Sequence, residues 1–135
     1  MIYFLDTNAV SDLLRRPDGA VGRRAREAGF DDLTVSGIVA AELRFGVVKN
    51  DALRLGRRLE TLLSRITVEP FDDAASRRYA EARAGLEAAG RPLDGNDMLI
   101  AAHALALGRP LVTDDRAFLG VPGLVVENWL RDEWA

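Results

Sequence analysis

The chain has 135 residues, of which 48% are hydrophobic and 29% charged, a balance typical of one soluble globular domain. It contains no cysteine, which excludes disulfides and thiolate metal sites. No apolar run approaches the roughly 20 residues that cross a bilayer, and Met1 leads into a strand-like run without the basic start of a secretory signal. We therefore expect a single domain over residues 1–135, located in the cytoplasm and without a membrane partner.

The net charge is −3, and the basic residues are 17 arginines and one lysine, Lys49. A protein coated with positive charge to grip nucleic acid is not indicated. The arginines are explained either by a GC-rich coding bias or by forked contacts to phosphates around an acidic site. The composition leaves both explanations open.

Five short runs, most of them apolar without clean alternation, predict strands covered on both faces: Ile2–Leu5, Leu33–Val35, Ile66–Val68, Leu111–Thr113 and Leu124–Val126. Helical spacing occurs between them, in Thr7–Arg15, Pro17–Ala28, Ser36–Val48, Asp51–Ser64, Asp72–Ala89 and Asn96–Leu107. Gly90 and Gly108 suit the ends of the last two helices. Strands that alternate with helices predict an α/β fold, a three-layer α/β/α sandwich with a mostly parallel central sheet.

Acidic residues follow the predicted strands at the edge where parallel sheets form their sites. Asp6 comes directly after the first strand, and Asp114 and Asp115 follow "PLVT". Asp97 lies near the start of the helix "NDMLIAAHALAL". For each of them alone, helix capping, worth about 1 kcal/mol, is the simpler explanation.

Glu42 is the acid that capping does not explain, because it lies in the middle of the helix "SGIVAAELRFGV". Its neighbours at three and four residues include Ile38, Val39 and Phe45, which form the apolar stripe. Burial of a carboxylate is costly unless it is paired or bound to a metal. An ion pair with an arginine is the alternative to a site role.

The acids taken together favour a metal site. Two carboxylates ~4 Å apart repel by on the order of 4 kcal/mol at an effective dielectric of 20, so several in one pocket imply a cation. Carboxylates without cysteine, and with a single histidine in the chain, suit Mg²⁺ or Mn²⁺. Such a site is typical of metal-assisted phosphodiester hydrolysis.

The segments "FLDTNAVSDLL", "SGIVAAELRFGV", "GNDMLIAAHALALGRPLVTDD" and "AF" resemble, in order and spacing, the PIN-domain ribonucleases. The resemblance spans nearly the whole chain and is greatest to the VapC-type toxins of bacterial toxin–antitoxin pairs. Each segment alone is a weak signal, whereas the ordered set is specific.

The resemblance implies that four acids are catalytic and bind the metal. They are Asp6 in "D-T-N", Glu42 in "A-E-L-R-F-G", Asp97 in "N-D-x-L-I-A-A", and Asp115, two residues after the strand-end threonine. Whether Asp114 or Asp115 faces the metal stays open.

Residues around these acids are expected to support them. Thr7, Asn8 and Thr113 would orient the carboxylates or the attacking water, and Asp94 would lie at the rim. Arginines would hold the RNA from the rim, and the candidates nearest to Asp6 in the chain are Arg15, Arg16, Arg23, Arg24 and Arg26.

The function implied by the resemblance is an Mg²⁺- or Mn²⁺-dependent endoribonuclease that acts as a toxin. It also implies RNA as substrate, a homodimer, and a cognate antitoxin whose segment covers the acidic pocket. The alternative is a non-catalytic interaction module of PIN fold that binds RNA or a partner protein. Such a module would be expected to have lost some of the acids, and this chain has all four.

Two other acid-bearing α/β families fit less well. A phosphatase-like domain of the haloacid dehalogenase type needs a second aspartate two residues after the first, where this chain has Asn8. That family and the receiver domains also need a lysine late in the chain, and Lys49 is inside or just past an earlier helix.

His103 lies on a helix that is apolar almost all round, so we predict a hydrogen-bonded packing histidine rather than a metal ligand. Trp129, Leu130 and Trp134 form an apolar C-terminal tail. The tail covers the sheet edge or contacts a partner, and the sequence does not decide between the two.

Overall fold

The computed structural model describes residues 1–130, and Trp134 lies outside this range. Its strands are β1 (Tyr3–Leu5), β2 (Leu33–Ser36), β3 (Thr67–Glu69), β4 (Leu111–Val112) and β5 (Val126–Glu127). They form one sheet in the order β3-β2-β1-β4-β5, and all the pairings are parallel. β1 is therefore central, and the expected parallel sheet is confirmed.

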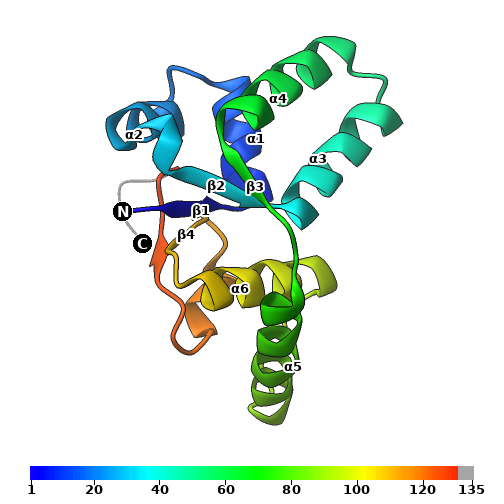
Figure 1. Ribbon diagram of the computed structural model, residues 1–135, viewed down its shortest axis with the longest axis vertical. Coiled ribbons are helices and arrows are strands. Elements are labelled where there is room, and N and C mark those ends of the chain that lie inside the picture. Colours follow the sequence, from blue (N-terminus) through cyan, green and yellow to red (C-terminus); the bar gives the residue numbers. More distant parts are fainter. Residues whose placement is uncertain (131–135) are drawn as a thin grey trace.

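Helices cover both faces of the sheet. They are α1 (Thr7–Arg15), α2 (Ala20–Ala28), α3 (Gly37–Lys49), α4 (Leu53–Arg65), α5 (Asp73–Ala88) and α6 (Gly95–Leu107). Two short 3₁₀ helices are η1 (Phe30–Asp32) and η2 (Arg116–Gly120). In Figure 1, α1 to α4 lie above the sheet, and α5 and α6 lie below it. This arrangement is the predicted three-layer sandwich.

Three predicted starts are wrong by two or three residues, and local turns explain them. α4 begins at Leu53 rather than Asp51, because Asp51 has a positive φ of 50° and Ala52 N–H bonds back to the Val47 carbonyl at 3.0 Å. α2 begins at Ala20 rather than Pro17, because a turn in which Gly19 N–H bonds to the Arg16 carbonyl (2.9 Å) precedes the helix. β5 begins at Val126 rather than Leu124, since Leu124 N–H bonds back to the Val121 carbonyl at 3.2 Å.

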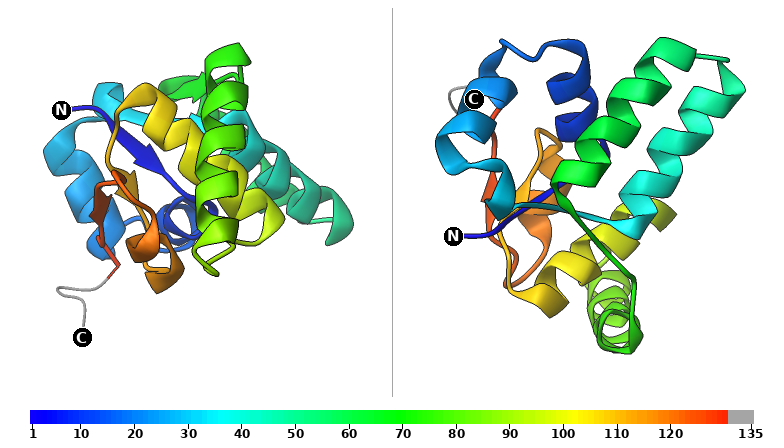
Figure 2. Two further views of the ribbon diagram at one scale, coloured as in Figure 1. Left: turned by 90° about the horizontal axis from the view of Figure 1, so that it is seen from below. Right: turned by 45° about the horizontal axis from the view of Figure 1, so that its top comes forward.

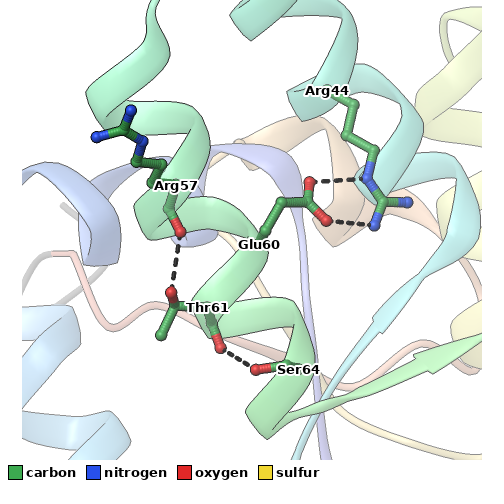
Figure 3. Close-up of polar contacts among 5 residues, drawn as sticks. All are labelled: Arg44, Arg57, Glu60, Thr61 and Ser64. Carbon is green, nitrogen blue, oxygen red and sulfur yellow. Dashed lines mark hydrogen bonds and ion pairs between the residues drawn. The ribbon is translucent and has the colours of Figure 1, made fainter.

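The α3–α4 pair forms a hairpin that projects beyond the sheet (Figure 2). Figure 3 shows the ion pair between its arms, in which the Arg44 guanidinium donates to both carboxylate oxygens of Glu60 at 3.0 and 2.8 Å. This hydrogen-bonded pair lowers the pKa of Glu60. Because both side chains are exposed, the pair orients the two helices but adds little stability.

His103 is a packing residue, as predicted. It is 1% exposed, and its Nδ1 lies 2.9 Å from Ser36 Oγ at the end of β2. The rings of Phe4 and Phe71 meet it edge-on. Burial lowers the pKa of His103, so the neutral ring joins α6 to the sheet.

Trp129 is buried and lies beside β5, so this tryptophan takes the first of the two alternatives left open for the tail and covers the sheet. Its ring packs edge-on against Tyr3 of β1 with centroids 4.9 Å apart, and its indole N–H donates to Glu127 at 3.1 Å. Over residues 1–130, no helix is both long enough and apolar enough to cross a bilayer.

Candidate active site

The carboxyl ends of the parallel strands meet at one edge of the sheet, and α1, α3 and α6 begin there. In the left view of Figure 2, β1 points toward the start of α1, and α6 begins on the same side. Each candidate acid lies on an element that starts or ends at this edge.

Asp6 links β1 to α1 and is 5% exposed. Its Oδ1 accepts a hydrogen bond from Ala9 N–H at 2.8 Å, so Asp6 does cap the helix. Burial raises the pKa of Asp6 to about 6, against hydrogen bonds from Thr113 and Ala9 that favour the charged form. The charges of Asp114 and Asp97 raise it further. A role as a helix cap explains the position of Asp6 but not the presence of two further acids within electrostatic range of it.

Glu42 is half-buried on α3 and accepts a hydrogen bond from the Thr7 hydroxyl at 3.2 Å. The apolar stripe expected around it is incomplete, because Phe45 is 65% exposed on the projecting hairpin. Within residues 1–130, no arginine forms an ion pair with Glu42. The alternative of a buried ion pair is therefore not supported.

Asp97 lies in the first turn of α6, where it does not cap the helix, since Asp94 occupies the N-cap position. Burial raises the pKa of Asp97, and the negative charges of Asp115, Glu42 and Asp94 raise it further. These influences place acids from α3, the α6 cap and the β4–η2 connection within electrostatic range of one carboxylate. The exposed Asp94 lies at the rim, where the sequence predicted it.

Asp114 and Asp115 both lie within electrostatic range of the other acids. Asp114 acts on Asp6 and Asp115 on Asp97 through their charges. Asp115 also caps η2, its Oδ1 accepting from Ala117 N–H at 2.9 Å. The Asp115 N–H donates to the Thr113 hydroxyl at 3.0 Å, and that hydroxyl bonds to Asp6.

The site is open rather than a closed coordination cage. Among residues 1–130, no three acidic or histidine side chains are close enough together to form a ready-made metal-binding group. Asn8 is exposed in the first turn of α1. The structure therefore gathers the expected carboxylates at one edge without bringing them into mutual contact.

The arginines proposed for the rim divide into two groups. Arg15 lines a hollow of about 190 Å³ together with Glu42, whereas Arg16 is paired with Asp12 on its own helix. The helix α2, which carries the other three arginines, lies near the amino end of β1, at the opposite edge (Figure 1). The prediction that these arginines lie at the rim of the site is therefore wrong. It relied on their closeness to Asp6 in the chain, but α1 carries the chain away from the site before α2 begins.

The comparisons with known proteins agree with this geometry. Residues 3–124 match the model of the PIN domain family. The chain is 36% identical over 132 residues to Ribonuclease VapC2 of Rickettsia felis, covering 96% of this chain and 98% of that protein. It belongs to the VapC ribonucleases of the PIN-domain family. VapC ribonucleases are the toxins of toxin–antitoxin pairs, as the resemblance implied.

Other relatives of this VapC chain are similar along their whole length. The tRNA(fMet)-specific endonuclease VapC of Shigella flexneri is 31% identical, with 94% of this chain and 97% of that protein covered. The structure of VapBC2 from Rickettsia felis bound to a promoter DNA fragment superimposes with a TM-score of 0.88 at 34% identity, covering 96% and 99%. FitAcB from Neisseria gonorrhoeae gives a TM-score of 0.83 at 29% identity, covering 94% and 97%.

Proposed function

We propose that this VapC ribonuclease is a metal-dependent endonuclease that hydrolyses RNA at the acidic edge of the sheet. Asp6, Glu42, Asp97 and Asp115 would hold one or two Mg²⁺ or Mn²⁺ ions, with the whole chain, residues 1–135, acting as a single nuclease domain. The observation that carries the proposal is the gathering of these acids at one edge of the sheet, where burial and, after it, the negative charges of neighbouring acids raise the pKa values of Asp6 and Asp97.

The donor set fits a hard divalent cation. All the candidate ligands are carboxylate oxygens, and the chain has no cysteine to favour a softer metal. The only histidine in the sequence, His103, is buried and contacts Ser36, so it is not among the candidate metal ligands. A bound cation would relieve the repulsion that disfavours the charged forms of Asp6 and Asp97.

The chain's own residues would orient the acids for the reaction. A bound cation supplies the activation of water and the neutralisation of phosphate charge that phosphodiester hydrolysis needs. Thr7 holds Glu42 through its hydroxyl. The Thr113 hydroxyl forms a hydrogen bond with the Asp6 side chain and accepts another from the backbone N–H of Asp115. No protein nucleophile is required, and Asn8, which is exposed in the first turn of α1, would help to orient the carboxylates or the attacking water.

The partners follow from the relatives. One relative is named a tRNA(fMet)-specific endonuclease, and solved relatives include VapBC complexes, one of them bound to promoter DNA. We infer a structured RNA such as tRNA as substrate, a cognate antitoxin of the VapB class that covers the acidic edge, and a homodimer of this chain.

The test is cleavage of labelled tRNA and of unstructured RNA by the purified protein, in Mg²⁺ or in excess chelator. We expect cleavage in Mg²⁺ alone, and its loss in Asp6→Asn and in Glu42→Gln. Glu27→Gln, on the exposed face of α2, is the matched control and should keep full activity. Equal cleavage in chelator would contradict the metal mechanism. RNA binding without cleavage in Mg²⁺ would favour the non-catalytic module instead.

A further inference from the structure

A hollow of about 460 Å³ lies beside the acids, between the loop that follows α5 and the 3₁₀ helix η2. Its walls are apolar and its edge is basic. The apolar side chains are Leu86, Pro92, Leu93 and Leu119, and the basic ones are Arg91 and Arg116. We call it the η2 hollow.

Both walls of the η2 hollow continue directly into the acidic edge. On one side, Leu93 is followed by Asp94, the N-cap of α6, and Asp97 lies in the next turn. On the other side, Arg116 follows Asp115, whose carboxylate caps η2 at Ala117. The acids at this edge and the hollow therefore share the same two backbone segments.

The Arg91 side chain reaches across the hollow. Its Nη1 lies 3.6 Å from the point that a Cβ on Gly120 would occupy, so the guanidinium lies against the backbone of η2. Arg91 and Arg116 are both exposed and come from the two opposite walls. Two arginines thus border an apolar hollow next to a cluster of acids.

A second hollow flanks the acids on their other side. It lies between α1, α3 and α4, and its lining includes Glu42, Arg15 and Asn50. The acidic edge consequently lies between two concave surfaces, each with an arginine and each containing or adjoining a candidate catalytic acid.

We propose that a single-stranded segment of the RNA, such as a loop of a tRNA, crosses the acidic edge from the Arg15 side to the η2 hollow. The nucleotide next to the cleaved bond would enter the η2 hollow, and Arg91 and Arg116 would contact the phosphates that flank it. Guanidinium groups bind phosphate oxygens in a forked geometry, and apolar walls accept the face of any base. This inference rests on the proposed function of the acidic edge and adds the path of the substrate across it.

The arginines also answer an electrostatic need. A polyanion that approaches several carboxylates on a chain of net charge −3 requires local positive charge close to the acids. The arginines of α2 do not supply it, because they lie at the opposite edge. Arg91 and Arg116 are next in the chain to the segments that carry Asp97 and Asp115.

The experiment measures binding of a labelled single-stranded RNA of about 12 nucleotides, a length in the range that single-strand sites cover. It uses the Asp6→Asn protein in Mg²⁺, so that the RNA is not cut, over a series of salt concentrations. The variant carries Arg91→Gln with Arg116→Gln. The matched control carries Arg23→Gln with Arg26→Gln, which removes the same charge at the opposite edge.

We expect the double substitution Arg91→Gln with Arg116→Gln to weaken RNA binding roughly tenfold at low salt. The salt slope should flatten by about 1.4, or about 0.7 for each phosphate that an arginine no longer neutralises. The control pair should leave both values unchanged. Equal losses in the two pairs, or a loss in the α2 pair alone, would overturn the proposed path. An Arg91/Arg116 effect confined to antitoxin affinity would also overturn it, since the hollow would then serve a protein partner.

Cleavage assays separate this inference from the proposed function. Suppose that the unsubstituted protein cuts RNA in Mg²⁺ but the variant with Arg91→Gln and Arg116→Gln binds RNA normally. The proposed path of the RNA is then wrong, and the nuclease assignment stands. If binding depends on the pair but no cleavage occurs in Mg²⁺, the path stands and the metal mechanism fails. Thermal unfolding of each variant verifies that weakened binding does not reflect a disrupted fold.

Discussion

The Thr7 hydroxyl donates a hydrogen bond to Glu42 Oε1 at 3.2 Å and so joins residues 35 positions apart in the chain. Thr7 directly follows Asp6, which caps the same helix. The start of α1 therefore positions two acids: Asp6 is the N-cap residue itself, and Glu42 of α3 is held by the hydrogen bond from Thr7. Thr113 provides a similar link between Asp6 and the backbone of Asp115.

Replacement of Thr7 by valine should reduce Mg²⁺-dependent cleavage about 10- to 100-fold, the usual effect of losing a residue that orients a metal ligand. Valine keeps the shape of threonine but cannot donate to Glu42. Thr7→Ser keeps the hydroxyl and is the control that should retain most of the activity. The measurement is cleavage rate against Mg²⁺ concentration. If valine and serine variants behave alike, the bond between Thr7 and Glu42 has no role in the reaction.

Mg²⁺ should raise the melting temperature of the protein, because a ligand that binds only the folded state stabilises it by mass action. The expected rise is several degrees at saturating metal, and Glu42→Gln should reduce it. In chelator, Glu42→Gln should melt at or above the temperature of the unsubstituted protein. A marked fall there would show that Glu42 has a structural partner, since breaking a buried ion pair costs about 3–5 kcal/mol.

The sequence predicted the five strands and their parallel arrangement, because each strand is a short apolar run and helical segments alternate with the strands, but it did not predict the order of the strands in the sheet. Asp6 shows how far this reasoning extends. Its place after β1 was sufficient to put it at the site edge, and its capping bond to Ala9 follows from the same position. Glu42 was identified because an acid in the middle of an apolar helix needs an explanation.

The sequence did not predict contacts made by side chains across elements. The bond between Thr7 and Glu42 depends on how α1 and α3 pack, which no local pattern encodes. The position of the α2 arginines was misjudged for the same reason, whereas Arg15 does line a hollow with Glu42. Arg91 is far from Asp6 in the chain, yet the return of α6 and β4 to the centre of the sheet brings its loop to the acidic edge.

His103→Gln should retain Mg²⁺-dependent cleavage, because His103 contacts Ser36 and aromatic rings rather than the acids. Burial lowers the pKa of His103 below its ordinary value of 6.5, so the unfolded chain binds more protons below that pH. The histidine therefore contributes stability above pH 6.5 that is lost as the pH falls. Urea unfolding between pH 5 and 7 in chelator should show this loss reduced in His103→Gln. Abolished cleavage in a variant that is still folded would contradict the packing role.

Asp6→Asn should stabilise the metal-free protein at pH 7 while it abolishes cleavage. The pKa of Asp6 is about 6 in the folded chain against an ordinary 3.8, so the folded state binds more protons between these values. Stability from this group is therefore full below pH 3.8 and is lost as the pH rises through 6, a loss of about 3 kcal/mol. Asparagine stays neutral and keeps an oxygen to accept from Ala9 N–H, so the variant avoids the loss and retains the helix cap.

Urea unfolding in chelator should show the advantage of Asp6→Asn growing from pH 4 to pH 7, and Asp18→Asn, at an exposed site, should show none. Mg²⁺ should shrink the advantage at pH 7, because only the unsubstituted protein has its full set of ligands. Parallel stability curves for the two proteins across this range would show that Asp6 is not held in a buried, negatively charged site.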